Sequence, residues 1–215
     1  SGLVEVKISD TLLNGLVGWW KFDETNGTVA FDSSGNGNDG NLTNGPTWVS
    51  GKIGGALSFD GTDDFVDLGE LGFFNNRQVL SVSVWAKIIS TSNAYNEIIT
   101  QNNVSAFSIT SSRKVHFNSY GGSWDIGLDS STSLELNQWK FITILRESSS
   151  VYIFLDGNLN ASTSSFTKSG SNSIRTLIGA KEVGGNYLNA ILDDVRIYDR
   201  ALSAAEVQAL YNMGQ

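Results

Sequence analysis

Two stretches at opposite ends of the chain decide the fold: GWWKFDE at residues 18–24 and LDDVRIYD at residues 192–199. Each resembles a strand with an apolar face, interrupted by acidic residues, and neither could bury that face alone. We therefore expect the two stretches to pair with each other. Pairing would bring carboxylate and carbonyl oxygens from both ends of the chain together, and these are the ligands that Ca²⁺ prefers.

Short apolar runs bounded by Gly, Asn, Asp or Ser lie between these ends and predict an all-β domain. In SVSVWA, residues 81–86, valine and serine alternate, as in a strand with one buried face. Asp156-Gly157 predicts a tight hairpin, because both positions tolerate a positive φ. The one credible helix covers residues 203–211, where a Ser-x-x-Glu spacing forms a capping box.

Composition limits the class of protein and of partner. The length of 215 residues suits one all-β domain, and a hydrophobic content of 40% can supply a large core. The net charge of −8 and the lack of a basic run argue against nucleic acid, since phosphate contacts need clustered Lys and Arg. No segment approaches the roughly 20 continuous apolar residues of a membrane span, so we expect no membrane insertion. The absence of cysteine leaves the cellular compartment open.

A set of short motifs occurs in a characteristic order along the chain. They are WKFDE at 20–24, DSSGNGN at 32–38, ALSFDG at 56–61, LSVSVW at 80–85 and the segment 192–210. This ordered set resembles the bacterial laminin G-like domains of the concanavalin A-like lectin/glucanase superfamily. The resemblance implies a jelly-roll sandwich of two antiparallel sheets with one short C-terminal helix. It implies this domain for residues 15–215 and leaves residues 1–14 as an N-terminal extension or a first edge strand.

The same resemblance implies a structural calcium ion that joins the first and last strands. The positions that match the family's ligands are Asp23, Asn38, the Gly40 carbonyl and Asp193. Such an ion would link residues that are far apart in sequence, so its binding free energy would add to the free energy of folding. The alternative is that these acids only cap turns, as they do in many all-β domains.

The sequence does not predict an enzyme. Related glucanases place their catalytic carboxylates in a Glu-x-Asp-x-x-Glu strand, and this chain has no such motif. Asp193 and Asp194 are adjacent in a predicted strand, so we expect them to face opposite sides and not to act as a pair. The chain has one histidine, His116, but no Gly-x-Ser-x-Gly elbow that could supply a serine nucleophile beside it. We therefore assign no catalytic residue.

A ligand site is predicted from aromatic and planar polar residues, the two kinds of side chain with which proteins hold sugars. Trp124 and Tyr120 flank a Gly-Gly pair in a polar segment, and by resemblance such loops rim the concave sheet. The candidate ligand-binding residues are Trp124, Tyr120, Asn118, His116, Gln101, Tyr95 and Arg113. Trp124 could instead fold back onto its own loop.

These observations predict a non-catalytic, calcium-stabilised, carbohydrate-binding module. We expect a glycan or another cell-surface ligand as its partner, and an extracellular or cell-surface location. We also expect the module to be tethered to other domains of a larger secreted or surface protein. The alternative is a cell-adhesion, protein-interaction or spacer module of a bacterial adhesin or multidomain enzyme, because a fold does not fix a function.

Overall fold

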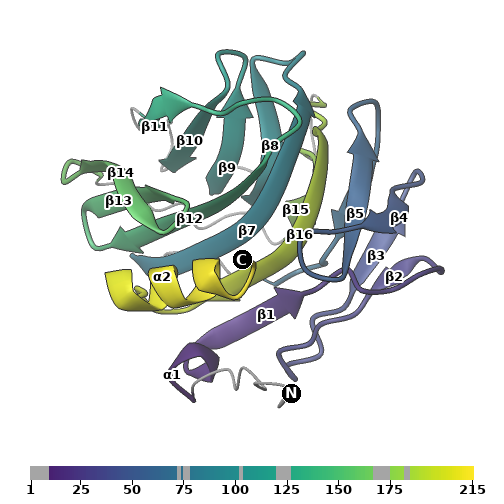
Figure 1. The fold of residues 1–215 in the computed structure, drawn as a ribbon, viewed down its shortest axis with the longest axis horizontal. Helices are drawn as coiled ribbons and strands as arrows, with labels where there is room; N and C mark the ends of the chain where they lie inside the picture. Colours follow the sequence, from purple (N-terminus) through teal and green to yellow (C-terminus); the bar gives the residue numbers. More distant parts are fainter. Residues whose placement is uncertain are drawn as a thin grey trace.

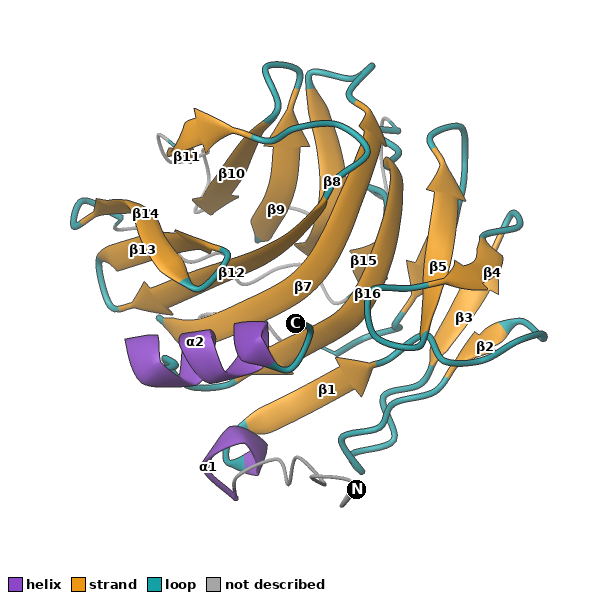
Figure 2. Cartoon of the chain, in the orientation of Figure 1, coloured by secondary structure: helices purple, strands orange, loops and turns teal. Residues whose placement is uncertain are grey.

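The computed structural model describes residues 10–71, 74, 78–101, 104–119, 127–166, 175–181 and 185–215. Most of this chain is strand (Figure 2), arranged as two antiparallel sheets. The all-β prediction is therefore confirmed. Neither of the two helices in this part of the chain is long and apolar enough to cross a membrane.

The first sheet contains the first and last strands of the described chain. Its strands are β1 (Leu16–Trp20), β4 (Thr47–Ser50), β5 (Gly55–Asp60), β7 (Val79–Ser90), β12 (Trp139–Glu147), β13 (Ser150–Leu155), β14 (Asn158–Thr163) and β16 (Asn189–Tyr198). Their order is β14-β13-β12-β7-β16-β5-β4, with β1 paired to β16. In that pairing Trp19 lies opposite Arg196 and Trp20 lies opposite Val195. The two end stretches therefore pair as predicted (Figure 1).

The second sheet faces the first across the core. Its strands are β2 (Val29–Ala30), β3 (Gly40–Thr43), β6 (Phe65–Asp67), β8 (Tyr95–Gln101), β9 (Ser105–Thr110), β10 (Lys114–Ser119), β11 (Leu128–Ser133) and β15 (Thr176–Ile178). Their order is β11-β10-β9-β8-β15-β6-β3-β2. One core cluster joins Val84 and Ile142 of the first sheet to Ile99, Phe107 and Phe117 of the second. Strand alternation thus buries one face of each sheet.

The outer face of the first sheet carries a second apolar cluster. Trp85, Phe141 and Tyr198 project from it and pack with Val207 and Leu210 of helix α2 (Ala204–Asn212). The helix lies across β7 and β16 in Figure 1. Its length agrees with the predicted C-terminal helix.

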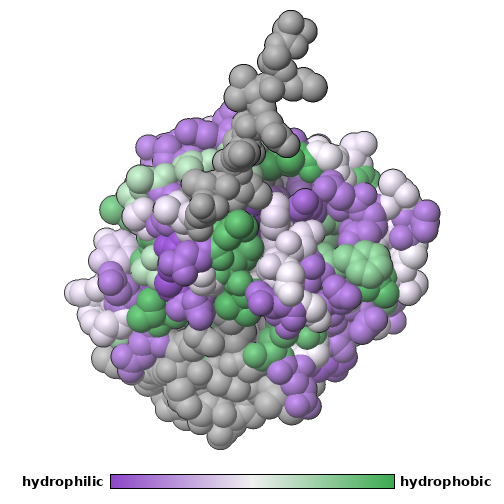
Figure 3. Space-filling view, turned by 90° about the horizontal axis from the view of Figure 1, so that it is seen from below, coloured by the Kyte–Doolittle hydropathy of each residue, from purple (hydrophilic) through white to green (hydrophobic). Residues whose placement is uncertain are grey.

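The N-terminal segment also reaches this second cluster. Residues 10–13 form the short helix α1 (Asp10–Leu13), whose Leu12 is buried there. Residues 1–9 lie outside the described part of the chain. On the face seen from below, hydrophobic residues form small separate groups among hydrophilic ones (Figure 3).

Two local signals of the sequence are confirmed by the backbone. Asp156 and Gly157, between β13 and β14, both have a positive φ, 50° and 79°, as a two-residue hairpin requires. At the start of α2, Ser203 and Glu206 form the reciprocal capping box.

The capping box gives a direct stability prediction. Ser203→Ala removes the side-chain acceptor of the Glu206 N–H, so we expect a loss of about 1 kcal/mol and a fall in Tm of about 2–4 °C. Ser33→Ala, at an exposed serine outside any helix, is the matched control and should leave Tm nearly unchanged. Thermal unfolding followed by circular dichroism measures both. Equal Tm values for the two variants would contradict the assigned role of the cap.

Candidate functional site

A row of polar side chains crosses four strands on the outer face of the second sheet. The strand register places Glu97 opposite Ser108, Ser108 opposite His116, and His116 opposite Asp129. Their chain neighbours Phe107 and Phe117 belong to the core, so alternation directs Ser108 and His116 outward. We call Glu97, Ser108, His116 and Asp129 the polar row.

His116 is held in one orientation by its neighbours. Its Nδ1 lies 2.6 Å from Asp129 Oδ1, and its ring centroid lies 5.0 Å from that of Tyr95. With a proton on Nδ1, the imidazole donates to the carboxylate, and Nε2 is the ring nitrogen that can accept a hydrogen bond. The predicted ligand residues His116 and Tyr95 are therefore in contact. Asp129 was not among the predicted residues.

Glu97 brings a buried carboxyl group to the other end of the row. Its side chain is 3% exposed, and burial raises its pKa to about 7, although Asn186 and Lys181 act in the opposite direction. Asn186 Nδ2 donates to Glu97 Oε1 at 3.3 Å. Among the described residues, neither Glu97 Oε2 nor the adjacent Ser108 Oγ has a hydrogen-bond partner. Two such buried atoms side by side need a partner from outside, either water or a ligand.

The other predicted ligand residues occupy different places. Asn118 lies two positions along β10 from His116, on the same outer face, and its Oδ1 is buried without a partner among the described residues. Arg113 lies in the turn before β10 with φ of 64°, and its N–H donates to the Thr110 carbonyl. Trp124 and Tyr120 lie outside the described residues.

Gln101 does not lie beside the other predicted ligand residues. It is fully buried on the core side of β8, where its Oε1 accepts from the Phe74 N–H at 2.7 Å. The register of β8 shifts between Glu97 and Ile99, which indicates a bulge. A bulge changes the alternation, so Glu97 faces outward while Ile99 and Gln101 face the core. Gln101 is therefore on the face of the sheet opposite to the polar row.

A small pocket lies where the first and last strands meet. Its volume is about 150 Å³, and we call it the junction pocket. It is lined by Trp19, Lys21, Asp23, Ile53, Asp193, Asp194, Arg196 and Met213. Two of the four predicted calcium ligands, Asp23 and Asp193, therefore share one pocket.

Asp193 is the most buried of the three aspartates in this pocket. Its Oδ2 accepts from the Lys52 and Ile53 N–H groups at 2.8 and 2.7 Å, but its Oδ1 has no partner in the described part of the chain. Burial raises the pKa of Asp193 to about 7, and the nearby charges of Asp194 and Asp23 act in the same direction. A cation beside Oδ1 would remove this cost, so the donor chemistry fits Ca²⁺.

Asp194 lines the same pocket as Asp193, so the expectation that these residues face opposite sides is wrong. The register of β16 against β7 shifts between Asp193 and Arg196, and Asp194 has a φ of 52°. This bulge reorients the second aspartate. Asp194 Oδ1 accepts from Trp19 Nε1 at 2.5 Å and from Arg196 Nη2 at 3.1 Å, so it is neutralised locally.

Asn38 and Gly40 do not line the junction pocket. Asn38 instead fixes its own loop to the first strand: its Nδ2 donates to the Val17 carbonyl at 2.7 Å, and its carbonyl accepts from Trp20 Nε1. Gly40 is buried in β3, where a Cβ would lie 2.4 Å from Val66 Cγ1. The structure thus gives both residues a role in chain packing.

A different cluster of three carboxylates lies in the turn between β5 and β6. Asp60, Asp63 and Asp64 hold ligand-type oxygens within 4.8 Å of one another. Two of them already close the turn: Asp60 Oδ1 accepts from the Thr62 N–H, and Asp64 Oδ2 accepts from the Asp60 N–H. This arrangement is typical of an acidic turn. Asp60 is therefore a suitable control position in a test of metal binding.

Comparisons with known proteins agree with this architecture. No curated protein matches the sequence. Domain 4 of AbnA, a GH43 extracellular arabinanase from Geobacillus stearothermophilus solved in complex with arabinotriose, is 20% identical with a TM-score of 0.74, and the match covers 91% of this chain and 98% of that one. The binding domain of Paraclostridial Mosquitocidal Protein 1 is 19% identical with a TM-score of 0.73, covering 94% of this chain and 53% of that one.

A third similar structure is the Trypanosoma rangeli sialidase in complex with the inhibitor DANA, which is 15% identical with a TM-score of 0.69. That match covers 91% of this chain but only 32% of the sialidase. At these identities the likeness shows the fold alone. A family model gives the stronger result, because it matches residues 60–208, which is more than half of the chain. The chain therefore belongs to the Concanavalin A-like lectin/glucanases superfamily.

Proposed function

We propose that this chain is a non-catalytic carbohydrate-binding module that holds its ligand on the polar row. The observation that carries the proposal is a pair of buried oxygens without a hydrogen-bond partner among the described residues, Glu97 Oε2 and Ser108 Oγ, beside the fixed His116 ring. Sugars offer hydroxyl groups that both donate and accept, so one sugar residue could satisfy all three groups. The exposed Tyr95 ring, next to His116, supplies a face for the apolar side of a pyranose or furanose.

The comparisons support this class of ligand and this context. The arabinanase domain was solved with arabinotriose, and the mosquitocidal protein's similar part is a binding domain. This chain spans about half of that binding domain's length and about a third of the sialidase. We therefore propose a module of a larger secreted or surface protein, stabilised by a structural calcium ion in the junction pocket.

Binding measurements with a matched pair of variants test the ligand site. We expect isothermal titration of arabinotriose, xylotriose and cellotriose at pH 8 to give saturable binding for at least one sugar. Glu97→Gln should weaken that binding about tenfold, since an ionised acceptor of a ligand hydroxyl is replaced by a neutral amide. Glu135→Gln, at an exposed glutamate before β12, should have no effect.

Two results would count against the proposal. One is the absence of binding by all three sugars, and the other is equal affinity of the Glu97→Gln and Glu135→Gln proteins. Binding to whole cells in the absence of sugar binding would favour the adhesion module instead. Binding to neither would favour the spacer.

A further inference from the structure

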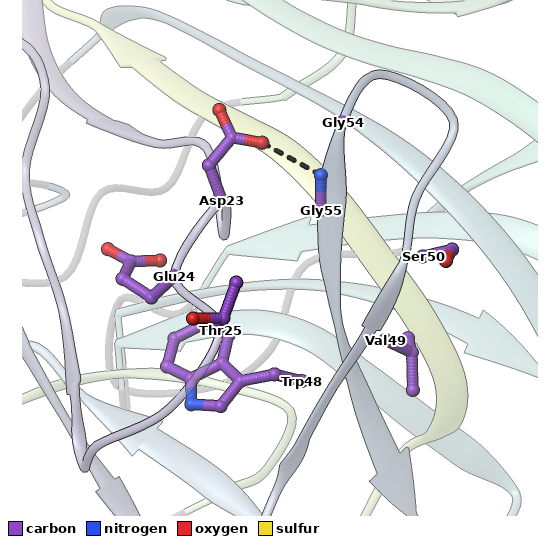
Figure 4. Close-up of a pocket in the computed structure, with 8 residues that line it drawn as sticks. All are labelled: Asp23, Glu24, Thr25, Trp48, Val49, Ser50, Gly54 and Gly55. Carbon is purple, nitrogen blue, oxygen red and sulfur yellow. Dashed lines mark hydrogen bonds between the residues drawn. The ribbon is translucent and has the colours of Figure 1, made fainter.

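An open cleft lies between the loop that follows the first strand and the β4–β5 hairpin (Figure 4). Its volume is about 450 Å³, which lies within the roughly 300–1,000 Å³ range of small-ligand sites. We call it the Trp48 cleft. It is lined by Asp23, Glu24, Thr25, Trp48, Val49, Ser50, Gly54 and Gly55. The cleft belongs to other strands than the polar row and is independent of it.

The indole of Trp48 is fixed before any ligand arrives. Trp48 is half-buried on β4, and its Nε1 donates to the Gly27 carbonyl at 3.0 Å. The buried Phe22 ring lies 6.5 Å away, tilted by 53°, and anchors the indole to the core. A ring held at both its polar and apolar edges loses little conformational entropy when it binds a ligand.

Two carboxylates hold the opposite wall of the cleft in place. Glu24 Oε1 accepts from the Phe31 N–H at 2.7 Å, whereas its Oε2 is buried and has no partner among the described residues. Asp23 Oδ1 accepts from the Gly55 N–H at 2.8 Å, a bond visible in Figure 4. The Glu24 Oε2 acceptor is therefore preorganised and unused.

Close approach of the backbone brings the two walls together. A Cβ on Gly55 would lie 2.4 Å from the Phe22 carbonyl oxygen, and one on Gly54 would lie 2.3 Å from Asp23 Oδ1. Gly54 also has a φ of 72°. Glycine at both positions is thus what allows the hairpin to lie against the loop that carries Asp23 and Glu24.

We propose that the Trp48 cleft is a second ligand site, which binds one neutral sugar residue with its apolar face on the indole. In this proposal the sugar hydroxyls donate to Glu24 Oε2, and Thr25 and Ser50 also line the cleft. The described lining residues include the carboxylates of Asp23 and Glu24 but neither Lys nor Arg. The negative charge of the cleft therefore disfavours an anionic ligand. The mixture of one aromatic face and several oxygen acceptors matches a polyhydroxylated ring.

The test uses the indole N–H resonance of Trp48, which Trp48→Phe identifies in a nitrogen–proton correlation spectrum. We expect arabinotriose, xylotriose or cellotriose to shift this resonance saturably. Glu24→Gln should weaken the apparent affinity at this resonance about tenfold. Glu135→Gln, at an exposed residue that does not line the cleft, is the matched control and should leave the affinity unchanged. Tm values within about 2 °C of each other would show that both variants are folded.

The same titration separates this site from the polar row, because His116 is the only histidine and its ring signals report the row alone. A shift at Trp48 without one at His116 would support the cleft and count against the polar row. The cleft proposal is overturned if the Trp48 resonance does not move with any of the three sugars, or if Glu24→Gln leaves the affinity unchanged. It is also overturned if spermidine shifts the resonance and the sugars do not, since the site would then select cations.

Discussion

Calcium is expected to raise the Tm of this protein by about 5–10 °C when its concentration reaches roughly 100 times the Kd. The physical reason is the Asp193 carboxylate, which is buried in the junction pocket near two other aspartates and has one oxygen without a partner in the described part of the chain. An ion bound there would link β1 and the β4–β5 hairpin to β16, and the unfolded chain would not hold it. Thermal unfolding in calcium and in excess chelator measures the shift.

Two aspartate variants locate the ion. Asp193→Asn keeps an oxygen for the Lys52 and Ile53 N–H groups but loses the charge, so its Tm should not respond to calcium. Asp60→Asn removes a carboxylate from the acidic turn between β5 and β6 and should keep the full response. The reverse pattern would place the ion in that turn. No response in the unaltered protein would remove calcium from the proposed function and leave the ligand sites to be judged by themselves.

The fold could be predicted from the sequence because its turns and caps have local signals and its two end strands each have an apolar face that needs cover. β1 and β16 each have an apolar face that needs a partner strand, and the two strands pair with each other. Asp156-Gly157 and the Ser203 cap depend on a few adjacent residues, and these also matched the structure. Such features follow from the chemistry of neighbours along the chain.

The candidate sites were harder to predict because they depend on bulges and on register between distant strands. Alternation places Gln101 and Glu97 on one face, but the bulge in β8 separates them. A second bulge brings Asp193 and Asp194 into one pocket. Asp129 meets His116 only because β11 pairs with β10 in one register. A single sequence gives no direct signal for a bulge or for that register.

The second large expected effect is a dependence of stability on pH. In excess chelator, the free energy of unfolding should fall between about pH 5 and pH 8. Glu97 and Asp193 are both buried, and each has a pKa raised to about 7, mainly by burial. In the unfolded chain these carboxyls ionise near their ordinary values of 4.5 and 3.8. The folded state therefore holds more protons over this interval, and its stability is lost as pH rises toward 7.

The size of the fall follows from the same two groups. Each carboxyl contributes on the order of 3 kcal/mol, because one pKa unit corresponds to about 1.4 kcal/mol. Urea unfolding at the two pH values measures the fall directly. Glu97→Gln and Asp193→Asn should each remove roughly half of it. A fall that persists undiminished in the double variant would show that other groups cause it.

Glu206→Gln is a control of opposite sign. The Arg200 guanidinium lowers the pKa of Glu206 to about 2, so this carboxylate stabilises the fold above pH 4.5 and loses that effect only in more acidic solution. Its variant should therefore be less stable at both pH 5 and pH 8 by a similar amount. Calcium should reverse the fall in the free energy of unfolding at high pH, because the ion and the proton compete for Asp193. If calcium instead stabilised the protein equally at pH 5 and pH 8, Asp193 would not be a ligand of the ion.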